Sequence, residues 1–212
     1  MITNHSTAAR RFFDWTVIRW SRNTRVDGLW VGVFVGRQEK EILGRLVEAL
    51  VQIKTYDPYR YRRVLREIER ILAYLLPGHS AVWLPALKRC VVDPRFILSA
   101  SPQLIASAIV HEATHAALNR RHIGYAEPLR ERVEKVCMHQ ELAFALKIPD
   151  GDQLRESIRI RLASATSDWL SDAALRERRI NGEFEMARHA NIPGWVMGAI
   201  QSIRERTLSR QR

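Results

Sequence analysis

The sequence predicts an α+β domain in which helices predominate. Long segments carry apolar residues at i, i+3 and i+4 spacing, whereas only a few short runs are rich in apolar and β-branched residues. The 212-residue chain is 46% hydrophobic and 27% charged, which suffices for one well-buried core. We therefore expect a main domain over residues 1–150, with a small sheet and packed helices, and a helical extension over residues 151–212 that packs on the same domain.

The N-terminal part is expected to supply the scaffold. Residues 28–36 form a short apolar run typical of a buried strand, and residues 11–21 before it fit either a helix or a strand. Residues 37–54 and 59–76 repeat the apolar spacing of amphipathic helices, and the second should end at Pro77-Gly78. Both helices are predicted to pack on the core.

Strand-type residues return on either side of an Asp-Pro pair, at 89–92 and 96–98, and a proline is tolerated in a sheet chiefly at an edge. One helix is then predicted to begin at Pro102, and another to cover residues 128–147. The C-terminal extension should contain helices over 152–164, 167–180 and 193–208, with Asn181-Gly182 as a break.

The functional signal is concentrated in His111-Glu112-Ala113-Thr114-His115, an H-E-x-x-H motif. At 3.6 residues per turn the two histidines lie one turn apart on one helix face, so both imidazoles can reach one cation. Glu112 lies about 100° further round the helix, where it can contact a water on the metal without being a ligand. Zinc lowers the pKa of such a water toward ~7, and a nearby carboxylate can then remove its proton. These three residues are the minimum set for metal-dependent hydrolysis.

The alternative is a chance motif in which the two histidines have no joint role. The flanking residues favour a helix that packs deeply instead. Ser101 and Pro102 provide an N-cap and a proline at the first helical position. Positions 113, 114, 116 and 117 are small and uncharged, as expected where a helix packs closely against a core.

Over residues 90–148 the sequence resembles the zincin metallopeptidases, through this motif and the helix that follows it. In the metzincin branch a third histidine stands six residues after the second motif histidine, but Arg121 occupies that position and His122 comes one residue too late. In the gluzincin branch the third ligand is a glutamate on the following helix, commonly after eighteen intervening residues, and this spacing leads to Glu134. The resemblance thus implies a Zn2+ site with Glu112 as general base and these ligands: His111, His115 and Glu134.

Glu141 is the competing third ligand. On a helical wheel Glu134 and Glu141 fall together at one border of the apolar face of residues 128–147, so both could look into one cleft. Glu141 could equally orient a ligand histidine through its other ring nitrogen. Either glutamate could also be a surface residue paired with a neighbouring basic residue. Some gluzincins carry an acidic residue four positions after the ligand, and Met138 departs from that pattern.

The resemblance also implies a peptide substrate that pairs with an edge strand just before the motif helix. Zincins often use a histidine or tyrosine to donate a hydrogen bond to the developing oxyanion. His122 and Tyr125, in the turn between the two helices, are the candidates here, and each could instead be a loop residue that packs locally.

The number of cysteines and the net charge limit which other functions need to be considered. Cys90 and Cys137 are too few for a disulfide framework or a zinc ribbon, and we expect both to be free and buried. Both could also approach the metal site, because the segments that flank the motif helix should line it. The net charge of +11 raises the alternative of a nucleic-acid partner, but the 34 basic residues are spread from Arg10 to Arg212 rather than clustered.

The leading hypothesis is a zinc-dependent metallopeptidase that acts on a peptide or protein. Its alternatives are a catalytically inactive zincin-like binding or scaffold protein, a nucleic-acid-associated protease, and a helical DNA-binding module in which the motif is accidental. No run approaches the ~20 apolar residues of a membrane helix. The first ten residues lack the pattern of a signal peptide, so a cytoplasmic location is expected.

Overall fold

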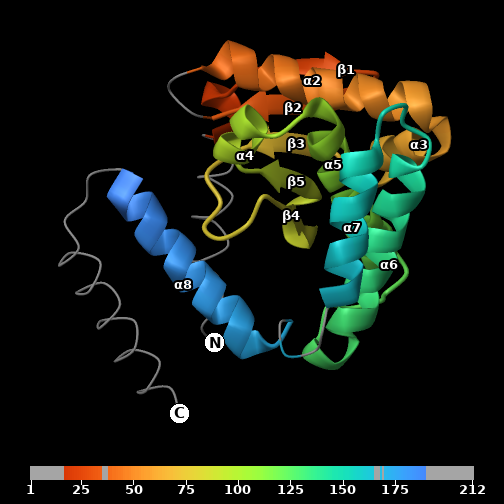
Figure 1. Cartoon of the computed structure of the whole chain (residues 1–212). Helices are drawn as coiled ribbons and strands as arrows, with labels where there is room; N and C mark the ends of the chain where they lie inside the picture. The colour runs from red at the N-terminus through yellow and green to blue at the C-terminus, as the bar shows by residue number, and fades with distance from the viewer. Residues whose placement is uncertain (1–16, 35–37, 165–167, 169, 190–212) are drawn as a thin grey trace.

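The structure, a computed structural model, describes residues 17–34, 38–164, 168 and 170–189 (Figure 1). Within this part of the chain the protein is α+β and mainly helical, as the sequence predicts. A small mixed sheet lies among the helices of the first half, and longer helices dominate the second half.

The described residues form one five-stranded sheet, in which the spatial order of the strands is β1-β2-β3-β5-β4. Its strands are β1 (Arg22–Val26), β2 (Leu29–Val33), β3 (Arg70–Ala73), β4 (Ala81–Leu84) and β5 (Arg89–Val92). The three inner strands are parallel to one another, and the two edge strands, β1 and β4, run antiparallel to their neighbours. The buried strand predicted at 28–36 is therefore β2, and the strand predicted at 89–92 is β5.

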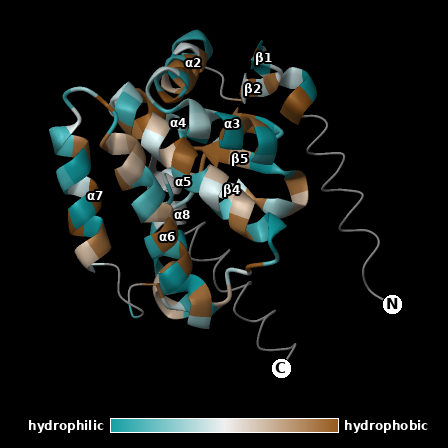
Figure 2. Cartoon of the chain, turned by 90° about the vertical axis from the view of Figure 1, so that its right-hand side faces the viewer, coloured by the Kyte–Doolittle hydropathy of each residue, from teal (hydrophilic) through white to brown (hydrophobic). Residues whose placement is uncertain are grey.

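The two faces of the sheet carry clusters of different size. Alternation along the strands places Val31 and Ile71 in the main core, whereas Trp30 and Leu72 belong to a smaller cluster with Val17. Figure 2 shows the strongly hydrophobic residues of β5 near the centre of the molecule. The sheet is thus a buried platform for the helices on its main face.

Three helices of the first half are fixed by apolar packing on the main core or by a buried aspartate that caps the helix start. Helix α2 (Glu39–Tyr56) lays its apolar stripe on the main core, in the span that the sequence predicts. Helix α3 (Pro58–Glu67) begins at Asp57, whose carboxylate accepts a hydrogen bond from the backbone N–H of Arg60 at 3.2 Å. Helix α4 (Pro94–Ser99) begins in the same way at Asp93.

Helix α5 (Pro102–Arg120), which carries the H-E-x-x-H motif, is largely buried among other elements. The hydroxyl of Ser101 accepts a hydrogen bond from the backbone N–H of Leu104 at 3.2 Å, so the predicted N-cap is confirmed. The helix contacts α2, α3, β4, β5 and helix α6 (Glu127–Ala145). Ala113, Thr114 and Ala116 are buried, because only small side chains allow neighbours to approach this closely.

The C-terminal helices extend from α6. Helix α7 (Asp152–Ser164) packs against α6, and helix α8 (Asp172–His189) forms a long arm from the base of α6 toward the turn before β4 (Figure 1). A Cβ at Gly182 would lie 2.0 Å from the backbone nitrogen of Gly78, so the glycine permits close contact of helix and turn. The predicted break at Asn181-Gly182 is therefore wrong. The third predicted helix, 193–208, lies outside the described residues.

The helix predicted over residues 59–76 is also wrong in its second half. Helix α3 ends at Glu67, Ile68 adopts an extended backbone, and residues 70–73 form β3 at the centre of the sheet. A short apolar run fits a helical stripe and a fully buried strand equally well. The pairing of β3 with strands on both sides decides between them.

The edge strand before the motif helix differs from the prediction as well. Residues 96–98 belong to helix α4, because the side chain of Asp93 caps a helix start at the Asp-Pro pair. The 89–92 strand is interior, and the edge is formed by β4, which pairs antiparallel with it. Both Cys90 and Cys137 are free and buried, as predicted. None of the described helices is both long and apolar enough to span a bilayer.

Replacing Asp57 with alanine is expected to lower the free energy of unfolding by about 3 kcal/mol at neutral pH. The Asp57 side chain is fully buried and pairs with Arg60 and Lys147, and removing one member of a buried ion pair leaves the other charge uncompensated. These partners lower the pKa of Asp57 although burial raises it. Its stabilisation is therefore complete above the unfolded value of ~4 and is lost as pH falls through the folded pKa.

Denaturant unfolding of Asp57→Ala from pH 7 to pH 3 would measure this effect. Glu69→Ala is the matched control, since its pair with Lys88 is solvent-exposed and should contribute at most ~1 kcal/mol. Equal destabilisation of the two variants would contradict the role of Asp57.

Candidate metal centre

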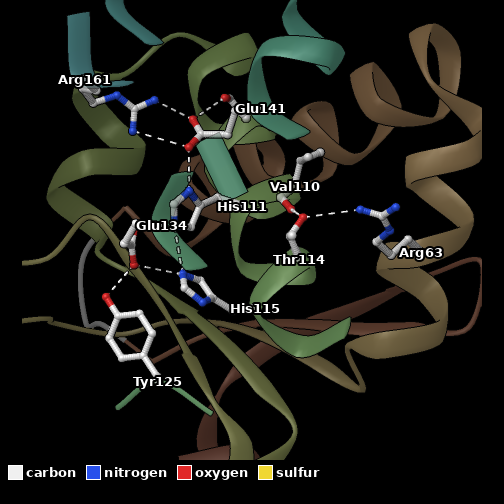
Figure 3. A network of polar contacts seen from close by, with 10 residues as sticks. Arg63, Val110, His111, Thr114, His115, Tyr125, Glu134, Glu141 and Arg161 are labelled. Carbon is white, nitrogen blue, oxygen red and sulfur yellow. Dashed lines mark hydrogen bonds and ion pairs between the residues drawn. The ribbon is translucent and has the colours of Figure 1, made fainter. Parts of the chain in front are cut away.

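The two motif histidines face the same point from successive turns of α5. His111 and His115 place their Nε2 atoms 3.0 Å apart, with ring centroids separated by 4.8 Å (Figure 3). Two ring nitrogens this close need either a shared proton or a shared cation between them. The predicted convergence of the motif histidines is therefore present.

Glu134 closes the triangle from α6. One carboxylate oxygen lies 3.3 Å from Nε2 of His111, and the other lies 3.3 Å from Nε2 of His115. A tetrahedral ion with ligands at 2.0–2.1 Å separates neighbouring ligand atoms by about 3.3 Å. The three side chains are therefore spaced as ligands of one ion.

The charge of Glu134 suits a cation. Burial on its own raises the pKa of this carboxyl, but contacts with His111 and His115 outweigh burial and hold the pKa well below its usual range. Glu134 is therefore an anion at neutral pH, and it contributes negative charge between two neutral or positive rings.

Glu141 occupies a different position from Glu134. Its carboxylate lies 2.6 Å from Nδ1 of His111, on the side of the ring away from Nε2. The same carboxylate accepts hydrogen bonds from Ser107 at 2.8 Å and from Arg161 at 2.5 Å, and Glu141 is only 2% exposed. A carboxylate at Nδ1 fixes the tautomer of the ring and directs the lone pair of Nε2 outward. Of the two roles weighed for Glu141 from the sequence, this contact matches the orienting one.

Cys137 lies one helical turn beyond Glu134 on α6. The ligand atoms of His111, His115 and Cys137 all lie within 4.8 Å of one another, so these three residues form a group that could hold a metal ion. The expectation that this cysteine approaches the site agrees with the geometry, while Cys90 is not a member of the group among the described residues.

Glu112 lies beside the triangle and is only 6% exposed. Burial raises the pKa of its carboxyl, while the neighbouring His111 and His115 act in the opposite direction. The backbone N–H of Trp83, in edge strand β4, donates a hydrogen bond to this carboxylate. Glu112 is thus held between the histidine pair and the edge strand, with a pKa shifted toward neutrality.

Tyr125 and His122, the two predicted oxyanion donors in the turn after α5, have different surroundings. The hydroxyl of Tyr125 donates to Glu134 at 2.5 Å, and its ring packs edge-on against His115 at 5.3 Å between centroids. Loss of hydration and the charge of Glu134 raise the pKa of Tyr125, so the hydroxyl keeps its proton. His122 is exposed, has a left-handed backbone with φ of 60°, and is not among the described residues that line the cleft.

The group opens onto a cleft of about 990 Å³. One wall is β4 with the turn before it, and another combines α5, α6 and α7. The remaining wall comes from α8, through Asp172, Leu175, Arg176, Arg178 and Arg179. His79, from the turn before β4, also lines the cleft, and its pKa is lowered by burial and by the charge of Arg178. The site is therefore assembled from segments that lie far apart in the sequence.

Several of these residues were not found by sequence reasoning. Ser107 stands one turn before His111 on the same helix, so the i, i+4 spacing could have signalled it. Arg161 and His79 carry no such signal, because each reaches the site from another element through the tertiary fold.

We compared the chain with protein-family models, curated proteins and solved structures, and none of the three comparisons finds a match. Relatives therefore add nothing to what the residues of the site indicate.

The purified protein is expected to bind one transition-metal ion per chain, and His115→Ala should lose it. The substitution removes one of two nitrogens that lie 3.0 Å apart, and the donors that remain should bind an ion too weakly to retain it through dialysis. Metal analysis after dialysis against zinc would measure the content. His139→Ala, an exposed histidine on α6, is the matched control and should retain the ion. Metal retained in His115→Ala would exclude this site.

Glu141→Gln is expected to weaken metal affinity by ~10–100-fold while leaving the stoichiometry at saturation unchanged. The amide cannot accept a charge-assisted hydrogen bond from the ring of His111 as the carboxylate does, and loss of such an outer partner typically has this effect. Competition with a chelator would measure the affinity. Glu131→Gln is the control on the same helix, because Glu131 pairs with Lys135 instead. Equal affinity in both variants would contradict the orienting role.

Proposed function

We propose that the protein is a zinc-dependent metallopeptidase with His111, His115 and Glu134 as metal ligands. The observation that carries this proposal is the Glu134 carboxylate, which lies 3.3 Å from Nε2 of each motif histidine. Two imidazole nitrogens and one carboxylate oxygen form a donor set found in catalytic zinc sites, and imidazole ligands favour zinc over magnesium or calcium.

Bound zinc would supply Lewis-acid polarisation of a water molecule and of the scissile carbonyl. Glu112 is the general base in this proposal: its carboxylate takes a proton from the attacking water and later gives it to the leaving amine. The burial of Glu112 favours this role, because burial raises the pKa of its carboxyl and so makes the carboxylate a better proton acceptor.

Tyr125 is the candidate for stabilising charge on the substrate. Its protonated hydroxyl already donates to Glu134 in the site, and a small reorientation could direct it to the developing oxyanion. We do not assign this role to His122, since it lies outside the cleft lining.

An extended peptide is the substrate that the cleft suits. Edge strand β4 contributes Ala81, Val82 and Trp83 to the cleft wall, directly beside Glu112. A strand edge binds an extended chain through backbone hydrogen bonds, which would bring a peptide bond to the metal group.

Glu112→Gln is expected to keep the metal and to lower the rate of peptide hydrolysis by ~10²–10⁴-fold, because the amide cannot accept the proton. Casein and a mixed fluorogenic peptide library are suitable substrates, and metal content should be measured on the same samples. Glu131→Gln should retain both metal and activity. Full activity in Glu112→Gln would remove Glu112 from the mechanism, and zinc-loaded wild type inactive on every substrate would contradict the peptidase proposal.

A further inference from the structure

We propose that Cys137 is a fourth protein ligand of this metal, so that the centre has a resting state closed by two histidines, one glutamate and one thiolate. This inference rests on the proposed metal centre and adds a ligand that a catalytic site of the two-histidine, one-glutamate kind does not need.

Cys137 shares a helix face with the proposed ligand Glu134. Cys137 follows Glu134 by three residues on α6, so both side chains project from one helix face toward α5. Glu141 follows Cys137 by four residues and contacts His111. Cys137 therefore lies between two residues that both reach the same histidine.

The Cys137 sulfur lies close to both motif histidines. The ligand atoms of Cys137, His111 and His115 are all within 4.8 Å of one another. A tetrahedral zinc ion with Zn–N of 2.0–2.1 Å and Zn–S of 2.3 Å separates nitrogen from sulfur by about 3.5 Å. Relative to the two histidine nitrogens, the sulfur thus needs to move by little more than about 1 Å to reach the spacing of a shared ion.

Cys137 is buried away from the cleft that the three proposed ligands line. His111, His115 and Glu134 line the cleft, whereas Cys137 is 0% exposed and is not part of the cleft lining among the described residues. The triangle of donors thus faces the cleft on one side, and we infer that Cys137 approaches it from the other. An ion on the cleft side can take water as its fourth ligand, and an ion on the core side can take Cys137.

The metal ion in this centre would then have two sets of ligands, one closed and one open. Four protein ligands make a closed site of the structural type, whereas an open fourth position is the mark of a catalytic site. Binding of the sulfur would release its S–H proton to solvent, because only the thiolate is a ligand and the charge of the cation would offset the burial that raises the pKa of the thiol. When the sulfur leaves, it takes up a proton again, and the ion can shift to the cleft side.

Cobalt(II) titration of the metal-free full-length protein tests this proposal without relying on activity. The wild type should show visible d–d bands and a near-ultraviolet thiolate-to-cobalt charge-transfer band, both saturating at one equivalent. Cys137→Ser should keep the d–d bands and lose the charge-transfer band. Cys90→Ser is the matched control and should keep both, since Cys90 is equally buried but lies in β5 outside the group.

Zinc affinity gives an independent readout. Chelator competition should show affinity weakened at least ~10-fold in Cys137→Ser and unchanged in Cys90→Ser, because even loss of an outer partner typically has an effect of this size. Circular dichroism should verify that each variant folds. If the buried serine hydroxyl prevents Cys137→Ser from folding, Cys137→Ala takes its place.

The outcomes separate this inference from the proposed function. Cobalt d–d bands without a charge-transfer band in the wild type would overturn the role of Cys137 and leave the other three ligands standing. The absence of every cobalt band, together with the absence of zinc binding, would overturn both the inference and the metal centre. A charge-transfer band that persists in Cys137→Ser would also overturn the inference.

Discussion

The contact of His111 with two carboxylates of α6 is the interaction on which the rest of the site depends. Glu141 holds one ring nitrogen and Glu134 faces the other, and both carboxylates are largely withdrawn from water. Buried charges are tolerated only where partners compensate them, so α5 and α6 must pack in one register for the pairs to form. Ser107 and Arg161 complete the compensation at Glu141. The packing of α5 on α6 and the geometry of the proposed metal ligands therefore depend on the same contacts.

The sheet supports α5 and, through α5, also α6. Parallel pairing of β3 with β2 and β5 fixes the platform under α5, and antiparallel β4 brings a free strand edge beside the motif. The hydrogen bond from Trp83 to Glu112 joins that edge to the proposed general base. Substrate alignment and proton transfer would therefore depend on the same short strand.

The C-terminal helices are joined to the site by polar contacts as well as by apolar residues of α7 that enter the main core. Arg161 of α7 binds Glu141, and Arg130 of α6 binds both Asp172 and the carbonyl oxygen of Leu170 at the start of α8. With the close contact of Gly182 and Gly78, these interactions hold α8 across the open side of the cleft.

The sequence by itself determined whatever follows from helical periodicity: the cap at Ser101, the convergence of His111 with His115, and the common face of Glu134 and Glu141. These features are local, because spacing along one helix fixes which side chains meet. The division of residues 59–76 into α3 and β3, the position of β4 at the edge, and the approach of Arg161, His79 and α8 were decided only by the tertiary structure. A short apolar run can serve a helix or a strand until its partners are in place, and nothing local encodes which distant element will cover a site. The same reason explains why the sequence left two carboxylates as rival ligands, whereas packing of α6 on α5 set one against Nε2 and the other against Nδ1.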